Sequence, residues 1–262
     1  MNILFTICGR DGSKGFKNKN LKNMNGVPLV YYTLSVIKLY QNIHPENSIM
    51  VAINTDSREL LEIICSQNMV SDIRTVKRKE ELAGDNAPKV EVVKDTYLNC
   101  REYGDFQVIV DLDITSPMRR VEDVERAIDT LLEKQEYDLV FSVVPARRSP
   151  YFNMVEKKGG CYGKICPSIY TARQQAPKSY ELNASIYAYR PCFLEHTIRK
   201  SILDYNCGII EMKDYLVLDI DTEEDFTQMS MLMKYFQGQD TELDKVITAA
   251  EEIQKMIAGV KI

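Results

Sequence analysis

The chain has 262 residues, of which 45% are hydrophobic and 27% charged, a composition typical of one large globular domain or of one domain with a smaller lobe. A formal net charge of −5 argues against general nucleic-acid binding, because that function needs a basic face. Seven cysteines without a C-x-x-C pair and only two histidines argue against a zinc site and a Ser-His-Asp triad. No apolar run resembles a signal peptide or reaches membrane-spanning length, which predicts a cytoplasmic protein with no membrane partner.

The first part of the chain alternates between strand-like and helix-like patterns. Short apolar runs, several of them apolar on both faces, predict buried strands at 2–8, 48–53, 73–76, 106–112 and 137–144. Amphipathic stretches between them predict helices at 28–41, 57–68, 89–102 and 122–134. This alternation predicts an α/β fold with a doubly wound, mostly parallel sheet.

The pattern changes after residue 144. Between 145 and 189, four prolines and a KKGG turn separate the short β-like pieces KICPSIYT and NASIYAY, which predicts a small antiparallel β insertion. Strand-like runs at 208–212 and 215–221 and a helix at 223–236 then return the chain to the α/β domain, which we assign to 1–144 and 190–236. Residues 237–262 are predicted to be a linker and an amphipathic helix that the activity does not need.

A glycine-rich basic loop, ICGRDGSKGFKNKN (7–20), follows the first predicted strand. Glycines at 9, 12 and 15 let backbone N–H groups approach an anion, and the lysines and Arg10 add positive charge, so the loop favours a diphosphate or triphosphate. Neither G-x-G-x-x-G nor the Walker A spelling is present. The alternative is a solvated charged loop.

The longer phrase GRDGSKGFKNKNLKNMNGVPLVYYT resembles the opening of the N-acylneuraminate cytidylyltransferases, the CMP-sialic acid synthetase family. Their pattern is close to A-R-x-x-S-K-G-x-x-x-K-N followed by P-L, and the matching residues are Arg10, Ser13, Lys14, Gly15, Lys19, Asn20, Pro28 and Leu29. The resemblance covers residues 2 to about 236 and implies a nucleotidyltransferase fold with CTP and a nine-carbon sugar acid as substrates. It makes Arg10, Lys14 and Lys19 the catalytic groups on the triphosphate, with Gly9, Gly12, Ser13 and Asn20 as further nucleotide-binding residues.

Three later segments extend the resemblance. In RKEELAGDNAPK (78–89) it implies nucleotide contacts by Arg78, Asp85 and Lys89, although the family often has a serine where Lys89 stands. In VDLDITSPMRR (110–120), Asp113 stands in place of the family's glutamine. The third segment, RQQAPKSYELNASIYAY (173–189), resembles the one that lines the family's sugar-acid site. The second and third segments together imply substrate binding by Asp113, Thr115, Ser116, Arg173, Gln174, Asn183 and Tyr187. The alternatives are a rim charge for Arg78, a turn-stabilising role for Asp113, and ordinary packing for the others.

A further segment, LVLDIDTEEDF (216–226), carries a D-x-D pair. On a strand, Asp219 and Asp221 would project to one face, and paired carboxylates need a cation or a shared proton. Oxygen ligands beside phosphates suit Mg²⁺, and the family's D-x-D-T-x-x-D pattern implies magnesium at these two residues. The alternative is that they cap the next helix.

The resemblance therefore implies transfer of CMP from CTP to a nonulosonic acid with release of pyrophosphate. It also implies a homodimer formed through the insertion, and VPARRSPYFNMVE (144–156) is nearest the bacterial legionaminate branch. The sequence leaves open a cytidylyltransferase for another sugar, a D-x-D glycosyltransferase and a nucleotide-binding protein without catalytic activity.

Overall fold

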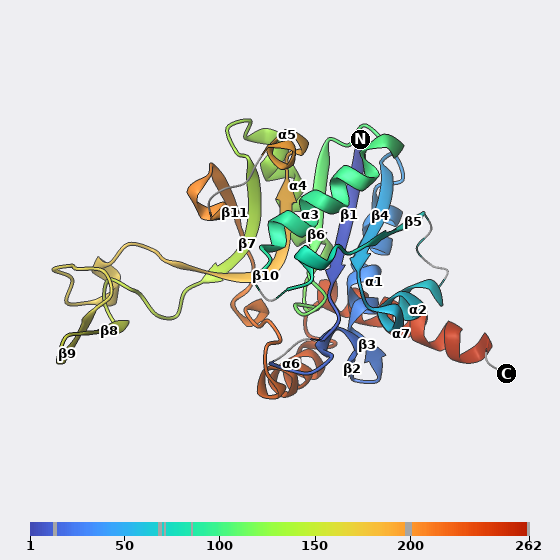
Figure 1. Ribbon diagram of the computed structural model, residues 1–262. Helices are drawn as coiled ribbons and strands as arrows, with labels where there is room; N and C mark the ends of the chain where they lie inside the picture. Colours follow the sequence, from blue (N-terminus) through green and yellow to red (C-terminus); the bar gives the residue numbers. More distant parts are fainter. Residues whose placement is uncertain (13–14, 68–69, 71, 85, 197–200, 261–262) are drawn as a thin grey trace.

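The computed structural model describes residues 1–12, 15–67, 70, 72–84, 86–196 and 201–260 (Figure 1). Its main feature is a seven-stranded sheet in the order β11-β7-β10-β6-β1-β4-β5, in which β10 runs antiparallel to both neighbours and the other pairs are parallel. The strands of this sheet are β1 (Asn2–Gly9), β4 (Ser48–Thr55), β5 (Ile73–Lys77), β6 (Val108–Leu112), β7 (Leu139–Pro145), β10 (Tyr180–Tyr189) and β11 (Cys207–Glu211). This is the mostly parallel α/β fold that the alternating pattern predicted.

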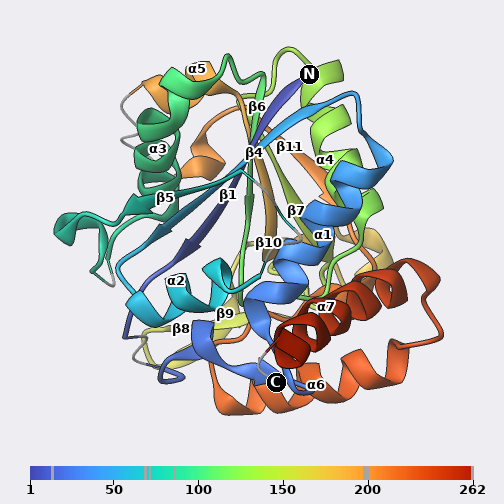
Figure 2. The ribbon, with the colours of Figure 1, turned by 90° about the vertical axis from the view of Figure 1, so that its right-hand side faces the viewer.

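Helices cover both faces of the sheet (Figure 2). The described helices are α1 (Leu29–Ile43), α2 (Arg58–Cys65), α3 (Lys89–Cys100), α4 (Val121–Glu133), α5 (Pro191–Glu195), α6 (Glu223–Phe236) and α7 (Thr241–Val260). The local signals that begin two of these helices are visible in the sequence. The Ser57 hydroxyl accepts from the Leu60 amide at the start of α2, and Thr222 and Asp225 form a capping box at the start of α6.

Alternate residues of the central strands face two separate cores. On β1, Ile3, Phe5 and Ile7 face the core under α1, α4 and α7, whereas Leu4 faces the core under α3. The same alternation on β6 points Asp111 to the α3 side, and its side chain is fully buried there. A charged residue inside an otherwise apolar strand needs a partner of opposite charge.

The insertion differs from its prediction. Its hairpin of β8 (Val155–Lys158) and β9 (Cys161–Lys164) extends away from the body of the molecule in Figure 1. The piece KICPSIYT (164–171), however, is not a strand, because β9 ends at its first residue, Lys164. Its Pro167 has no N–H to donate to a neighbouring strand. NASIYAY belongs to β10 and lies in the main sheet between β6 and β7, so the predicted boundary at residue 189 falls inside the sheet domain.

Two expectations for the C-terminal quarter are wrong. Residues 215–221 do not form a strand; Asp214–Leu216 is a 3-10 turn, and the segment runs across the carboxyl ends of the strands, where the Ile220 amide donates to the Thr115 carbonyl at 3.0 Å. The helix α7 is part of the domain rather than a tail, because Leu243, Val246 and Ile253 are buried in the same core as α1. A further small hairpin, β2 (Asn23–Met24) with β3 (Val27–Pro28), precedes α1. No helix among the described residues is long and apolar enough to span a membrane.

Candidate functional site

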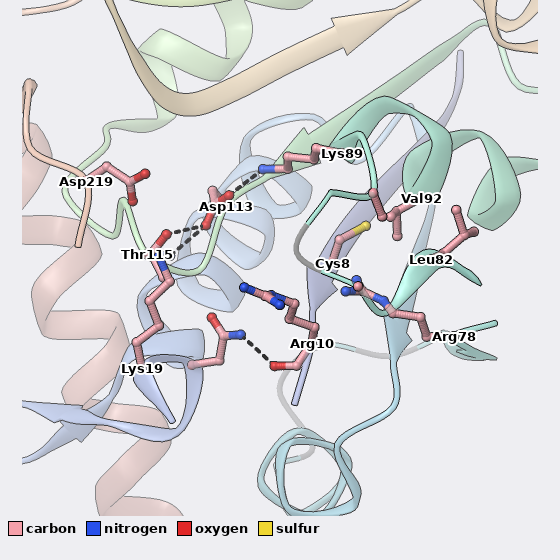
Figure 3. Close-up of a pocket in the computed structure, with 13 residues that line it drawn as sticks. Cys8, Arg10, Lys19, Arg78, Leu82, Lys89, Val92, Asp113, Thr115 and Asp219 are labelled. Atoms are coloured by element: carbon pink, nitrogen blue, oxygen red, sulfur yellow. Dashed lines mark hydrogen bonds and ion pairs between the residues drawn. The ribbon is translucent and has the colours of Figure 1, made fainter. Parts of the chain in front are cut away.

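A cavity of about 200 Å³ opens at the carboxyl ends of β1 and β6 (Figure 3), where open α/β sheets bind their ligands. Eight residues predicted from the sequence line it: Arg10, Lys19, Asn20, Arg78, Lys89, Asp113, Thr115 and Asp219. They come from four segments that are far apart in the chain. An apolar wall of Cys8, Leu82, Ala87 and Val92 completes the cavity. Leu82 belongs to the segment that resembles the family's nucleotide loop, but the sequence did not single out the other three, which look like ordinary hydrophobic residues.

The basic loop enters the cavity from β1. A Cβ on Gly9 would lie 2.5 Å from a terminal methyl of Leu60 and 2.9 Å from one of Ile114, so a larger residue here would have to displace these buried side chains. Gly12 adopts a left-handed backbone with φ +62, which turns the chain at low cost for a glycine. The Asn20 amide donates to the Arg10 carbonyl at 3.0 Å and closes the loop. Ser13 and Lys14, both predicted to bind the triphosphate, lie outside the described residues.

The loop is held against the segment that carries the D-x-D pair. Lys19 Nζ donates to the Ile220 carbonyl at 2.7 Å and lies 2.9 Å from Asp221 Oδ1. A Cβ on Gly15 would lie 2.8 Å from the Asp221 carbonyl oxygen, and Phe16 packs against Phe226 of α6. The loop and this segment therefore form one packed unit.

Arg78 forms part of the opposite wall. Its guanidinium is buried and donates from Nε to Asn54 Oδ1 and from Nη2 to the Asn54 carbonyl, both at 3.0 Å. Asn54 of β4 thus fixes a buried cation at the cavity edge, in contrast to the exposed rim charge that was the alternative. Asp85 lies outside the described residues.

Lys89 and Asp113, two positions that depart from the family pattern, meet in the cavity. Lys89 Nζ lies 2.5 Å from Asp113 Oδ2 and 2.9 Å from Asp111 Oδ2, and 5.3 Å from the centre of the Tyr187 ring. Burial lowers the pKa of Lys89, but the two carboxylates outweigh it and hold the pKa above its usual value. Burial likewise raises the pKa of Asp113, but the Lys89 ammonium and the Thr115 hydrogen bonds outweigh it and hold the pKa well below its usual value.

The two carboxylates of the D-x-D pair have different surroundings. Asp219 lines the cavity, with Ser116 Oγ 3.4 Å from its Oδ1, and burial together with the nearby Asp113 carboxylate raises its pKa. Asp221 is 74% exposed and is paired with Lys19. The described residues contain no group of three or more His, Cys, Asp or Glu placed to hold a metal. Asp219 fits a cation that also binds phosphate oxygens, because a positive charge would relieve its unfavourable surroundings.

The other predicted substrate-binding residues lie elsewhere. Arg173 and Gln174 line a second cavity of about 480 Å³ at the base of the insertion, together with Tyr180. Asn183 is buried; its Oδ1 accepts from the Ser142 hydroxyl at 2.6 Å and its Nδ2 donates to the Leu216 carbonyl at 2.9 Å.

Ser116 and Tyr187 are also buried. The Ser116 hydroxyl donates to the Asn183 carbonyl at 3.0 Å, while the Tyr187 ring lies beneath the Lys89 ammonium. In this structure Asn183 and Ser116 therefore support the site from below, through contacts within the protein.

Comparisons with known proteins bear on the family and on the fold. A model of the protein family described as Cytidylyltransferase matches residues 4–255. The chain is 35% identical to the post-translational flagellin modification protein B of Campylobacter coli, over 88% of this chain and 95% of that protein. It is 34% identical to the CMP-N,N′-diacetyllegionaminic acid synthase of Campylobacter jejuni, over 88% and 94%. A solved structure of CMP:2-keto-3-deoxy-manno-octonic acid synthetase complexed with CTP superposes with a TM-score of 0.63 over 90% of this chain and 99% of that one; at 14% identity this likeness shows the fold.

Proposed function

The chain belongs to the cytidylyltransferase family, and we propose that it transfers CMP from CTP to a nonulosonic acid and releases pyrophosphate. One observation carries the proposal: three cations and a carboxylate line the same cavity, namely Arg10, Lys19, Arg78 and Asp219. A hydroxyl of the sugar attacks the α-phosphorus as pyrophosphate leaves, which requires alignment and charge neutralisation more than a covalent intermediate.

Arg10 and Lys19 neutralise the triphosphate in this proposal, together with Lys14 of the same loop. For Lys19 to do so, its ammonium exchanges the Asp221 carboxylate for phosphate oxygens. Mg²⁺ is the proposed cofactor, held by Asp219 and by Asp221 once Lys19 has released it. When bound it supplies positive charge to the leaving pyrophosphate.

Pyrophosphate release from CTP tests the proposal. We expect release that requires both Mg²⁺ and a nonulosonic acid, and that stops in Asp219→Ala. A glycosyltransferase or a nucleotide-binding protein without catalytic activity would release none under the same conditions, and release with another sugar alone would identify a different cytidylyltransferase.

The acceptor is proposed to be N,N′-diacetyllegionaminate. A relative named for that product is 34% identical over 88% of the chain, and the second cavity offers Tyr180 beside Arg173, an aromatic wall beside a fork-shaped cation suited to a carboxylate. Apolar walls reject an added hydroxyl weakly, by on the order of a hundredfold, so N-acetylneuraminate should react detectably. Parallel kcat/KM measurements decide between the two acids, and a neuraminate preference would contradict this assignment.

We also propose a cytoplasmic homodimer that forms through the insertion. The projecting hairpin and its surroundings expose large apolar side chains, among them Val155, Tyr162 and Ile169, which are 61%, 73% and 93% exposed. A second copy of the chain is the proposed cover for this surface. Light scattering at micromolar concentration should give twice the 30.1 kDa chain mass, and a monomer would contradict the proposal.

A further inference from the structure

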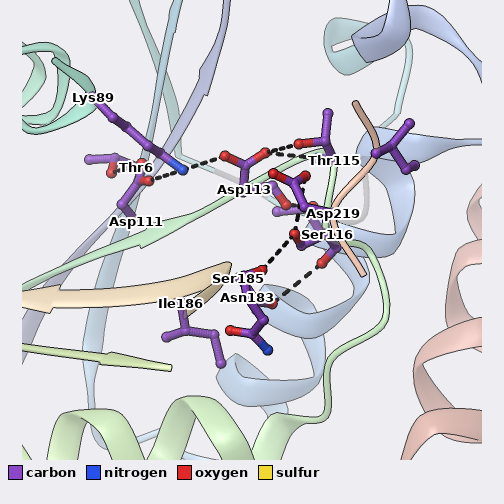
Figure 4. Close-up of polar contacts among 12 residues, drawn as sticks. Thr6, Lys89, Asp111, Asp113, Thr115, Ser116, Asn183, Ser185, Ile186 and Asp219 are labelled. Atoms are coloured by element: carbon purple, nitrogen blue, oxygen red, sulfur yellow. Dashed lines mark hydrogen bonds and ion pairs between the residues drawn. The ribbon is translucent and has the colours of Figure 1, made fainter. Parts of the chain in front are cut away.

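A continuous chain of polar contacts passes through Lys89, Asp113 and Thr115, which line the cavity (Figure 4). It begins at Lys89, the first residue of α3, whose ammonium lies between the carboxylates of Asp111 and Asp113. Asp111 is in turn held by the Thr6 hydroxyl, which donates to its Oδ1 at 2.8 Å. Residues on three elements, β1, β6 and α3, therefore fix the position of the Lys89 ammonium.

The chain of contacts continues from Asp113 to the segment with the D-x-D pair. The Thr115 amide and hydroxyl both donate to Asp113 Oδ1, at 2.8 and 2.7 Å. The Thr115 carbonyl accepts from the Ile220 amide at 3.0 Å, between Asp219 and Asp221. We call Lys89, Asp113, Thr115 and Ile220 the polar chain, because each member contacts the next.

Charge argues against a phosphate on Lys89. Its single positive charge already faces two carboxylates, and Asp111 is fully buried while Asp113 is 18% exposed. Taking the ammonium away from them would leave two neighbouring carboxylates in a poorly solvated place, which is strongly unfavourable. Lys19 differs, because the Asp221 side chain that it contacts is 74% exposed and can turn to water.

We propose that Lys89 is a positioning residue: it holds Asp113, and through Thr115 it orients the backbone that carries Asp219, rather than binding the phosphates of the nucleotide. The predicted effect on turnover rests on the proposed function. The predicted effect on how firmly the 113–116 loop is held does not.

Steady-state kinetics of Lys89→Met, Asp113→Asn and the double variant test the effect on turnover. Each single change should lower kcat on the order of tenfold to a hundredfold and leave the KM for CTP within about threefold. The double variant should lose no more than the worse single variant, since both changes break the same contact. Lys89→Arg, which keeps the charge, should recover part of kcat. Lys79→Met is the matched control, because Lys79 likewise pairs with a carboxylate, that of Asp95 at 2.7 Å, but does not line the cavity of Lys89, Asp113 and Thr115.

Hydrogen exchange of the unliganded protein gives a readout that does not depend on turnover. The amides of Thr115 and Ile220 should exchange faster in Lys89→Met, and remain as in the wild type in Lys79→Met. If Lys89→Met does not fold, the comparison of Lys89→Arg with Asp113→Asn carries the test.

Three results would overturn the proposal: a KM for CTP raised tenfold with kcat unchanged, additive losses in the double variant, or unchanged exchange at Thr115. A wild-type protein that releases no pyrophosphate would instead contradict the proposed function, and the exchange result would still decide whether Lys89 positions the loop.

Discussion

Replacing Asp240 by Asn should destabilise the protein by anchoring α7 less firmly. Asp240 Oδ1 accepts from the amides of Glu242 and Leu243 at 3.1 and 3.2 Å, which caps the helix. Its Oδ2 accepts from Lys213 Nζ at 2.8 Å and from the Tyr215 hydroxyl. Burial raises the pKa of Asp240, but these donors outweigh it and lower the pKa from 3.8 to about 2.

The size of the effect follows from this pKa. At about 1.4 kcal/mol for each pKa unit, the change from 3.8 to about 2 corresponds to about 2.5 kcal/mol in favour of the ionised form at neutral pH. Asn keeps a cap acceptor but lacks the charge, so it should lose about that amount. With an unfolding entropy of roughly 0.55 kcal/mol/K for a chain of 262 residues, Tm should fall by about 4–5 °C.

Thermal unfolding measured by circular dichroism checks this, with Glu242→Gln as the matched control. Glu242 is two residues away and undergoes the same carboxylate-to-amide change, but its partner Lys245 is 56% exposed, so we expect a shift of about 1 °C or less. Because the folded pKa of Asp240 lies below its unfolded value, its contribution is complete above about pH 4 and is lost as the pH falls towards 2. Equal Tm values for the two variants at neutral pH, or an undiminished difference at pH 2, would refute the reasoning.

Three further outcomes follow from the structure. Gly15→Ala should weaken CTP binding measured by calorimetry, since its Cβ would lie 2.8 Å from the Asp221 carbonyl and push the basic loop away. Removal of the chain from Gln239 onward should abolish the cooperative thermal transition, because it strips buried side chains from the core beside α1. Lys19→Ala should lower kcat/KM far more than Lys22→Ala, because the Lys22 ammonium lies over the Phe16 ring and outside the cavity. Equal small losses would favour the alternative that the loop is a solvated charged surface.

Most of the fold could be predicted from the sequence because local pattern and environment agree. Buried parallel strands need apolar side chains on both faces, and the runs around β1, β4 and β6 have them. The error at 215–221 has the opposite cause. Its alternation is that of a strand, but its backbone partners come from a loop and from the Asn183 side chain, which donates to the Leu216 carbonyl. Those partners are distant in the sequence and cannot be seen in a local pattern.

The position of α7 shows a second limit of prediction from the sequence. An amphipathic helix has an apolar stripe that must be covered, and the sequence could not say whether α1 or another protein would cover it. The structure places that stripe against α1, with Leu243 and Val246 fully buried. The motifs that carry the resemblance end near residue 236, so they give no sign that α7 belongs to the domain.

The site shows why spacing alone cannot assign a pair of carboxylates. The chain has the D-x-D spacing twice, at Asp111 and Asp113 and at Asp219 and Asp221. The first pair sits on β6 and just beyond it, so both carboxylates point to one side, and there the Lys89 ammonium lies between them. The second pair lies on irregular backbone, which sends Asp219 into the cavity and Asp221 to Lys19. The nearest cation decides whether such a pair serves as an ion pair within the protein or as a place for a metal. Because that cation comes from a distant segment of the chain, the two pairs of carboxylates can be told apart in the folded structure but not from their spacing in the sequence.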